Sequence, residues 1–508
     1  MGKGTRMSKP MNVLLISTDQ MRRDHMGCGG NPVIRTPNLD RLAAAGTCLD
    51  RAYVSNPLCM PNRSTIATGR LPRNHLCWSN GIRLPAHERT IADVLNDRGY
   101  HTTLLGKAHF QNFGRGRNVP VEQAGMECRE AWVKGVLSAD WTGPYYGFQD
   151  VRLCVGHGVG TLQTAHLGQW AARRHPEALE LLRQPHEPSP TGAPQCSTPP
   201  VPAAAHSSTW LGEIGPEYLR DRARDGRPFF GWLSFPDPHH PFTPPPGYDT
   251  LYDPADVVMP PVTAEALADK PPHYRRAYEG GEPWEGIGAN EHLANITEPQ
   301  MRETLARTYG MITLVDENIG RLLDALDETG LAENTIVIFT SDHGDLMGDC
   351  GLVFKGPFLL EGLINVPMIW RIPGVAGGVR SAGLMSSVDI APTVLELLGV
   401  DVPAWMDGMA LGALARGGPS ARRTAFVEFK SMYRPDLNLR AAVTADAKCV
   451  YYAGQDFGEL YDLTADRPEA KNLYDDPDWS DVRCEMESQI LDDAVLSHDE
   501  RLMPECHA

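Results

Sequence analysis

The sequence predicts an α/β fold in which helices cover both faces of a large, mostly parallel sheet, followed by a smaller C-terminal α+β domain with an antiparallel sheet. Three observations predict it. Short apolar runs alternate with amphipathic helical segments over most of the chain. Polar clusters directly follow several of those runs, as at the carboxyl ends of strands in open sheets. Beyond about residue 420, short strand-like runs follow one another closely.

Each element of the large sheet has its own signal. Strands are expected at four short apolar runs, 13–17, 102–105, 229–234 and 335–340. Helices are expected where apolar residues recur at helical spacing, in 37–46, 90–97, 301–326 and from 389 onward. Residues 177–206 are rich in proline, serine and alanine and are expected to form a surface insertion.

The C-terminal part is expected to hold strands at 426–429, 441–444, 449–452 and 460–463, and a last helix at 481–495. We therefore predict a catalytic domain over 11–420 and a smaller subdomain and tail over 421–508. The loop regions 110–176 and 243–295 are expected to line the substrate pocket.

Composition narrows the class of protein. The 508 residues carry a net charge of −17, which argues against nucleic acid or an anionic membrane as a partner. Apolar runs of about 18 residues, the length of a membrane span, do not occur. Residues 1–12 are charged without an apolar stretch, unlike a secretory signal, so a cytoplasmic location is expected. The eleven cysteines form no CxxC pair, and free thiols are expected.

The most informative segment runs from Cys59 to Gly69. Cys59 is followed at fixed steps by Pro61, Arg63, Thr68 and Gly69, and the segment reads as the start of a helix, where proline is tolerated. Backbone N–H groups at a helix start, together with Arg63, favour an anionic oxygen. A nucleophile at Cys59 would therefore meet phosphate or sulfate esters.

Two polar pairs are candidates for a metal site. Asp19-Gln20 and Asp342-His343 each follow a buried apolar run, so their side chains can meet at one edge of a parallel sheet. Carboxylate and amide oxygens suit Ca²⁺, Mg²⁺ or Mn²⁺, while His343 shifts the preference toward Mn²⁺ or Zn²⁺. We expect one divalent ion, Ca²⁺ or Mn²⁺ first, with Mg²⁺ and Zn²⁺ as alternatives.

The segment from Cys59 resembles the signature C-x-P-x-R, followed by Thr-Gly, of the sulfatases and the related phosphonate monoester hydrolases of the alkaline phosphatase superfamily. The resemblance implies that a maturation enzyme oxidises Cys59 to formylglycine. One hydroxyl of the hydrated aldehyde then attacks sulfur or phosphorus, and the other expels the product. It also implies that Arg63 supports the formylglycine, and that Asp19, Gln20, Asp342 and His343 bind the metal.

Four further roles are implied by the same resemblance. Lys107 and His109 match a G-K-x-H element and would bind a nucleophile hydroxyl and assist proton transfer. His239, in P-H-H-P-F, would donate to the leaving oxygen. Lys355 would contact substrate oxygens and offset their charge. Asn80 is a weaker candidate for a substrate contact. The resemblance extends over about residues 11 to 475, since 460–473 resembles a C-terminal element of the family.

Two enzymatic alternatives remain open at this point. Lys107 and His109 favour an arylsulfatase, whereas Gln20 and His343 favour a phosphonate monoester hydrolase or phosphodiesterase, and one site could serve both. We favour the sulfatase. A hypothesis of another class is a metal-dependent phosphomutase-like or binding protein with unmodified Cys59. The expected partners are a small anionic ester and the formylglycine-generating enzyme, and a homo-oligomer is possible.

Overall fold

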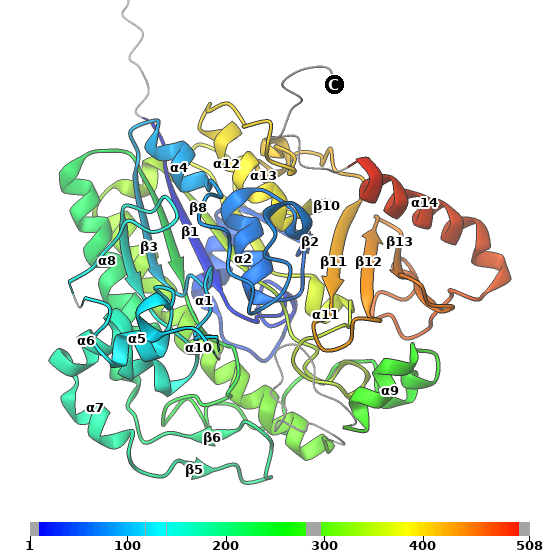
Figure 1. The fold of residues 1–508 in the computed structure, drawn as a ribbon, viewed down its shortest axis with the longest axis horizontal. Coiled ribbons are helices and arrows are strands. Elements are labelled where there is room, and N and C mark those ends of the chain that lie inside the picture. Colours follow the sequence, from blue (N-terminus) through cyan, green and yellow to red (C-terminus); the bar gives the residue numbers. More distant parts are fainter. Residues whose placement is uncertain (1–9, 117, 139, 281–295, 497–508) are drawn as a thin grey trace, which may run out of the picture.

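The computed structural model describes residues 10–116, 118–138, 140–280 and 296–496. Its centre is an eight-stranded sheet in the order β10-β2-β9-β8-β1-β7-β3-β4 (Figure 1), in which only β9 runs antiparallel to its neighbours. The strands are β1 (Asn12–Thr18), β2 (Thr47–Tyr53), β3 (His101–Gly106), β4 (Asp150–Leu153), β7 (Phe229–Ser234), β8 (Thr335–Ser341), β9 (Met368–Arg371) and β10 (Val379–Ser386).

The register of the central strands brings their carboxyl ends together. Ser17 of β1 pairs with Ser234 of β7, and Thr18 pairs with Ser341 of β8. All residues of these three strands are buried, as expected for parallel strands covered on both faces. The segments that follow β1, β7 and β8 therefore start at one edge of the sheet, where ligands of open α/β sheets bind.

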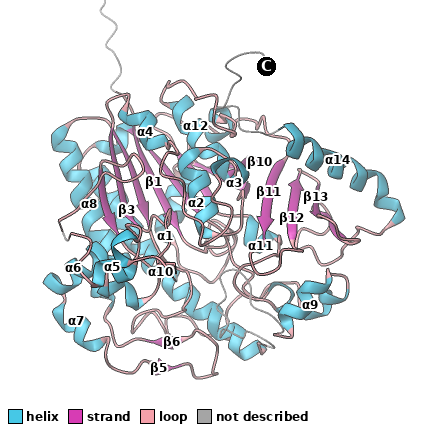
Figure 2. Cartoon of the chain, viewed as in Figure 1, coloured by secondary structure: helices cyan, strands magenta, loops and turns pink. Residues whose placement is uncertain are grey.

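Helices pack on both faces of the sheet (Figure 2). A Cβ on Gly231 would touch Tyr218, and one on Gly215 would touch Leu233, so α8 lies on one face. Trp232 points to the other face, where its ring meets Phe110. The main helices are α1 (Pro37–Ala44), α2 (Cys59–Thr68), α4 (Ile91–Asn96), α6 (Ala165–Arg174), α8 (Ser207–Asp225), α10 (Glu298–Glu328), α12 (Ile390–Leu397) and α14 (Ser480–Leu496).

Short helices occupy the connections between these elements: α3 (Pro72–His75), α5 (Arg129–Val133), α7 (Pro176–Leu181), α9 (Pro272–Tyr278), α11 (Glu361–Ile364) and α13 (Gly412–Ala415). The proline-rich segment 177–206 holds part of α7 and the small ladder of β5 (Glu187–Pro188) and β6 (Ser197–Thr198). Within the expected loop region 243–295, α9 is helical, and residues 281–295 lie outside the described part of the chain.

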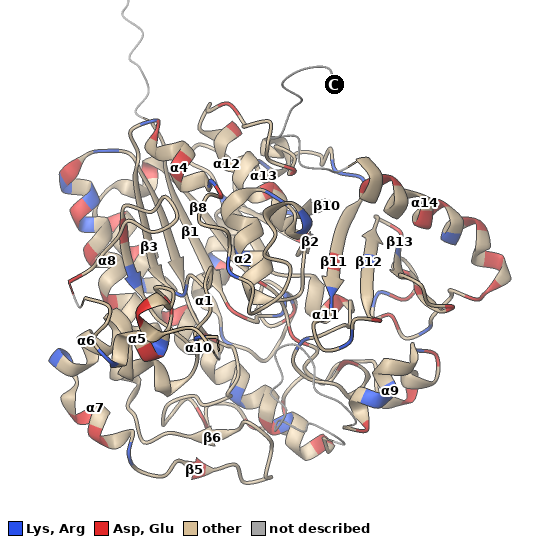
Figure 3. Cartoon of the chain, viewed as in Figure 1, with Lys and Arg blue, Asp and Glu red and all other residues tan. Residues whose placement is uncertain are grey.

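The C-terminal part is an antiparallel four-stranded sheet in sequential order, against which α14 packs (Figure 1). Its strands are β11 (Ala425–Lys430), β12 (Asn438–Val443), β13 (Ala447–Tyr452) and β14 (Gly458–Asp462). A buried ion pair between Lys448 and Glu469 ties this sheet to the rest of the molecule, because Lys448 Nζ also donates to the carbonyl oxygen of Leu359. Acidic residues, red in Figure 3, lie along α14.

The predicted fold class is confirmed, and each expected strand and helix is found within a few residues of its predicted bounds. The sequence analysis did not predict β2, β4, β9, β10, α6 or α8, and the expected loop region 110–176 in fact contains β4, α5 and α6. Strand β2 contains the half-buried pair Asp50 and Arg51, and β4 has only four residues, so neither shows a long apolar run. The proposed domain boundary near 420 stays a prediction.

Two other expectations concern the whole chain. The ten cysteines within the described ranges are free thiols. The helices in the part of the chain that the structure describes are all too short or too polar to cross a bilayer.

Candidate active site

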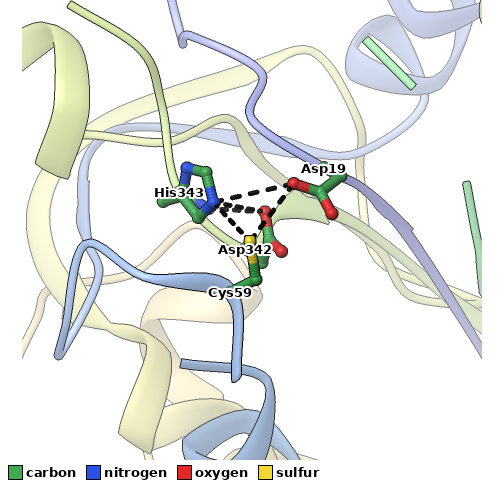
Figure 4. Close-up of side chains that lie close together, drawn as sticks. All are labelled: Asp19, Cys59, Asp342 and His343. Atoms are coloured by element: carbon green, nitrogen blue, oxygen red, sulfur yellow. Dashed lines mark hydrogen bonds and ion pairs between the residues drawn. The ribbon is translucent and has the colours of Figure 1, made fainter. Parts of the chain in front are cut away.

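Four side chains from three elements converge at the carboxyl edge of the sheet (Figure 4): Asp19 after β1, Cys59 at the start of α2, and Asp342 and His343 after β8. The Sγ atom of Cys59 lies 3.1 Å from His343 Nε2 and 3.7 Å from Asp19 Oδ1. His343 Nε2 lies 3.6 Å from Asp19 Oδ1 and 3.7 Å from Asp342 Oδ1. All four residues are fully buried.

The backbone fixes these positions. The N–H of Asp342 donates to the carbonyl oxygen of Thr18, so the two strand ends stay in register beyond the sheet. Gln20 has a φ of 65°, a left-handed conformation that turns the chain sharply after Asp19. Its N–H donates to Asp342 Oδ1 at 3.1 Å. The two predicted metal pairs are therefore joined by a hydrogen bond from the backbone N–H of Gln20 to the carboxylate of Asp342.

Arg63 holds the carboxylates of the site together. Its Nε donates to Asp342 Oδ2 at 2.7 Å, its Nη2 lies 3.4 Å from Asp19 Oδ2, and its Nη1 donates to Ser234 Oγ at 2.6 Å. Burial acts to raise the pKa of Asp342, but the charge of Arg63 and its neighbours holds that pKa well below its usual range. Asp342 is therefore a carboxylate.

Lys355 lies directly over Cys59. Its Nζ is 3.1 Å from Cys59 Sγ, 2.8 Å from His239 Nε2 and 3.0 Å from Gln20 Oε1. Burial raises the pKa of the Cys59 thiol, against the opposing charge of Lys355. Burial and the nearby charge of His157 and Lys355 lower the pKa of His239 well below its ordinary value. His239 is therefore neutral and able to hold a proton at one ring nitrogen.

Lys107 pairs with Asp19, and His109 follows two residues later. Lys107 Nζ donates to Asp19 Oδ2 and lies 2.6 Å from Nε2 of His157. Burial lowers the pKa of Lys107 to about 7. The ring of His109 stacks on Phe113 at 3.9 Å, and its Nδ1 is buried without a hydrogen-bond partner. An unpaired buried nitrogen is costly and marks a position where a ligand or water can bind.

The structure brings most predicted site residues together but places two of them at the margin. Gln20 lies beside the four-residue group: its Oε1 accepts from Lys355, and its Nε2 donates to Asp345 Oδ2 at 2.5 Å. Asn80 lies at the start of α2, where its Oδ1 accepts from the N–H of Met60. That oxygen completes the first helical turn, where N–H groups otherwise lack partners.

The donor set fits a divalent cation. Asp19, Asp342 and His343 offer two carboxylates and one imidazole within 4.8 Å of one another and of Cys59 Sγ. Without a divalent ion, the two buried carboxylates would repel one another, offset by the ion pairs that Arg63 makes with both and that Lys107 makes with Asp19. Such donors suit Ca²⁺, Mn²⁺, Mg²⁺ or Zn²⁺. The identity of the ion stays open.

Two residues of the site were missed from the sequence. His157 follows β4 and contacts Lys107, and its ring stacks on that of His239. Asp345 accepts from Gln20 and from the backbone N–H groups of Met347 and Phe354. The sequence signal for His157 was a histidine between two glycines after a short alternating run. For Asp345 the signal was only its position three residues after Asp342.

Comparison with known proteins decides the family. The family model "Sulfatase" matches residues 11–400. The chain belongs to the sulfatase family. A second model, for the C-terminal region of N-sulphoglucosamine sulphohydrolase, matches residues 348–495. As a member of this family, the chain shares the alkaline phosphatase-like fold and the hydrolase class expected from its motifs.

Similar proteins cover nearly the whole chain of this sulfatase family member. An arylsulfatase of Clostridium perfringens is 28% identical over 482 residues, which are 92% of this chain and 91% of that protein. A multifunctional alkaline phosphatase superfamily protein of Trinickia caryophylli is 29% identical and covers 92% of both chains. The solved phosphonate monoester hydrolase of Agrobacterium radiobacter has a TM-score of 0.78 and 27% identity over 97% of both chains. The chain is thus a hydrolase of the class that cleaves sulfuric esters or phosphonate monoesters.

Proposed function

We propose that this chain is a formylglycine- and metal-dependent hydrolase of sulfate monoesters, of the arylsulfatase type, that also accepts phosphonate monoesters and phosphodiesters. The observation that carries the proposal is the position of Cys59. Its Sγ lies 3.1 Å from both Lys355 Nζ and His343 Nε2, at the first residue of a helix. A nucleophilic atom at this point would meet an anion held by positive charge and by the helix start.

Two groups would complete the chemistry. Formylglycine formed from Cys59 supplies, as its hydrate, an oxygen nucleophile that a buried thiol does not provide. A divalent ion held by Asp19, Asp342 and His343, with Gln20 beside them, would offset negative charge on the ester.

The chain's own residues then divide the remaining work. Arg63 contacts the carboxylates of both Asp342 and Asp19 and fixes their orientation for binding the metal. The proposal assigns the leaving oxygen to Lys355 and His239, which are 2.8 Å apart: Lys355 offsets its charge, and the proton shared by Lys355 Nζ and His239 Nε2 is available to it. Lys107 and His109 would remove the proton whose loss releases the product.

The positive charge that is buried at this site suits the binding of a monoanionic ester. The chain as a whole carries a net charge of −17, yet Arg63, Lys107 and Lys355 are all buried at this one site. An anion can bind there because the charge of the whole protein acts over longer, screened distances. Asn80 is included as a substrate contact, since it lies against the residue that follows Cys59.

A second candidate is a phosphonate monoester hydrolase or phosphodiesterase as the main activity. It is supported by Gln20 and His343 and by the similarity to the phosphonate monoester hydrolase of Agrobacterium radiobacter over 97% of both chains. Sulfate monoesters and phosphonate monoesters are both tetrahedral monoanions, so one site can accept both. We also propose the formylglycine-generating enzyme as a partner, a cytoplasmic location and a homo-oligomer.

The experiment compares 4-nitrophenyl sulfate with 4-nitrophenyl phenylphosphonate, using wild-type protein and Cys59→Ala produced with a formylglycine-generating enzyme. The proposal expects kcat/KM to be higher for the sulfate and both activities to disappear in Cys59→Ala. A higher value for the phosphonate would select the second candidate. Metal binding without either activity would instead favour a phosphomutase-like or binding protein with unmodified Cys59.

A further inference from the structure

His157 is held at the active site by an unusual turn. It follows β4, and the glycines on either side have φ angles of +98° for Gly156 and +59° for Gly158, which favour residues without a Cβ. A Cβ on Gly158 would lie 2.9 Å from Cγ of Pro241. The turn therefore packs against the segment that carries His239 and can only fit there with glycine.

Two contacts connect His157 with the catalytic groups. Its Nε2 lies 2.6 Å from Lys107 Nζ. When Lys107 carries its proton it can only donate, so this nitrogen then accepts and the neutral imidazole holds its proton on Nδ1. The ring of His157 also stacks on that of His239, with centroids 3.5 Å apart and planes inclined by 5°.

His239 shows the same pattern with the other lysine. Its Nε2 lies 2.8 Å from Lys355 Nζ, and its Nδ1 lies 2.5 Å from the carbonyl oxygen of His240. Each of the two stacked imidazoles therefore contacts one lysine through its Nε2 atom. One lysine contacts Asp19 and the other contacts Cys59. A shift of either ring moves a lysine that borders the reacting centre.

We propose that His157 is a positioning residue of this hydrolase: its Nε2 holds the Lys107 ammonium on Asp19, and its ring holds the plane of His239 toward the leaving oxygen. The inference rests on the proposed function, since it takes His239 as the group that serves the leaving oxygen. Misplacing a catalytic group by about 1 Å can cost on the order of 100-fold in rate. The side chain of His157 is 19% exposed.

Two substitutions separate the two contacts. His157→Phe keeps a flat ring against His239 and removes the acceptor for Lys107. His157→Gln keeps a polar acceptor and removes the ring. Both are measured as kcat and KM on 4-nitrophenyl sulfate and on phenyl sulfate, because the more basic phenolate depends more on proton donation as it leaves. The control is His87→Gln, since His87 has a 71% exposed side chain.

The inference expects kcat of His157→Phe to fall on the order of 10- to 100-fold on both esters alike. His157→Gln should lose about tenfold more on phenyl sulfate than on 4-nitrophenyl sulfate. KM should change little, and the mass of the peptide that contains residue 59 should match the wild type. His87→Gln should behave as the wild type. If only one of the two variants folds, its losses of kcat on the two esters still test the contact that this variant removes.

Other outcomes overturn the inference. Rates within about threefold of wild type on both esters would show that neither contact matters. Equal losses in both variants on both esters, together with a lowered thermal midpoint, would show a role in folding only. A failure of the proposed function looks different: the wild type itself would be inactive on both esters, or Cys59→Ala would keep the activity.

Discussion

Arg63 Nε donates a 2.7 Å hydrogen bond to Asp342 Oδ2, and both side chains are buried with at most 1% exposure. This bond joins the helix that begins at Cys59 to the strand end that carries His343. Through its other nitrogens, Arg63 also contacts Asp19 and Ser234. One guanidinium therefore sets the geometry between the helix that carries Cys59 and the side chains proposed to bind the metal.

Replacing Arg63 with methionine should destabilise the protein as well as inactivate it. The change leaves the carboxylate of Asp342 buried without its partner, which costs about 3–5 kcal/mol. Urea unfolding followed by fluorescence measures this loss. The matched control is Arg302→Met, which removes an exposed pair with Glu298 and should cost about 0.5 kcal/mol or less. Equal effects of the two substitutions would contradict the assigned role of Arg63.

The metal content tests the donor set. The wild type is expected to retain about one divalent ion per chain, measured by elemental analysis after dialysis. Asp19→Asn weakens the charge that faces His343 and should lower both metal content and activity, and chelation should abolish activity in the wild type. Adding back Ca²⁺, Mn²⁺, Mg²⁺ and Zn²⁺ in turn identifies the ion. Full metal content in Asp19→Asn would mean that the ion lies elsewhere.

The buried pair of Lys448 and Glu469 should help to hold in place the loop that runs from Lys355 to Leu359. Lys448 also donates to the carbonyl oxygen of Leu359, four positions after Lys355. Lys448→Met leaves Glu469 unpaired and should cost about 3–5 kcal/mol and lower kcat. Lys471→Met, with a side chain that is 67% exposed, is the control. A stable, fully active Lys448→Met would show that the C-terminal sheet does not hold this loop.

Burial raises the pKa of Glu469 to about 7, above the ordinary value of 4.5. An acid with a raised pKa in the folded state binds more protons when folded, so its contribution to stability falls as pH rises between these values. Without the opposing charge of Lys448, that fall should steepen. The free energy of unfolding of Lys448→Met should therefore lie further below the wild type at pH 8 than at pH 6.

A buried histidine should make the protein less stable in mild acid. Burial, with the charge of Arg70, lowers the pKa of His75 from 6.5 to about 3. The unfolded chain then binds more protons than the folded chain between these values, so the free energy of unfolding falls as pH drops below about 6.5. His75→Gln should reduce that slope by on the order of 1.4 kcal/mol per pH unit. Unfolding curves of both proteins at pH 7, 6 and 5 measure the slopes; identical slopes would contradict the assignment.

The central strands, and the place of the candidate metal-binding residues at their ends, could be predicted because each depends on neighbours in sequence. Val13 to Ile16 is a continuous apolar run, and Asp19 comes three positions after it, so the same short segment predicts both the strand and the candidate ligand. The helix expected at 301–326 has apolar residues at helical spacing along its whole length, and α10 extends it only slightly at each end.

The rest depends on partners far apart in the chain. His157 belongs to the site only because β4 pairs with β3, which ends beside Lys107, and four residues give too weak a pattern to predict that strand. Asp345 acts on Gln20 across 325 positions of sequence. Strand β2 carries Asp50 and Arg51 inside the sheet, where Asp50 pairs with Arg23 and Arg51 donates to the carbonyl oxygen of Ala445, a compensation that periodicity does not reveal.

The most direct test of the account is the mass of the tryptic peptide 52–63, which contains residue 59. It is measured in protein produced with and without a formylglycine-generating enzyme, together with activity on 4-nitrophenyl sulfate. The account predicts a loss of about 18 Da, as thiol-to-aldehyde conversion requires, and activity only in the converted sample. An unconverted peptide from a sample of equal activity would contradict it and would move the nucleophile away from residue 59.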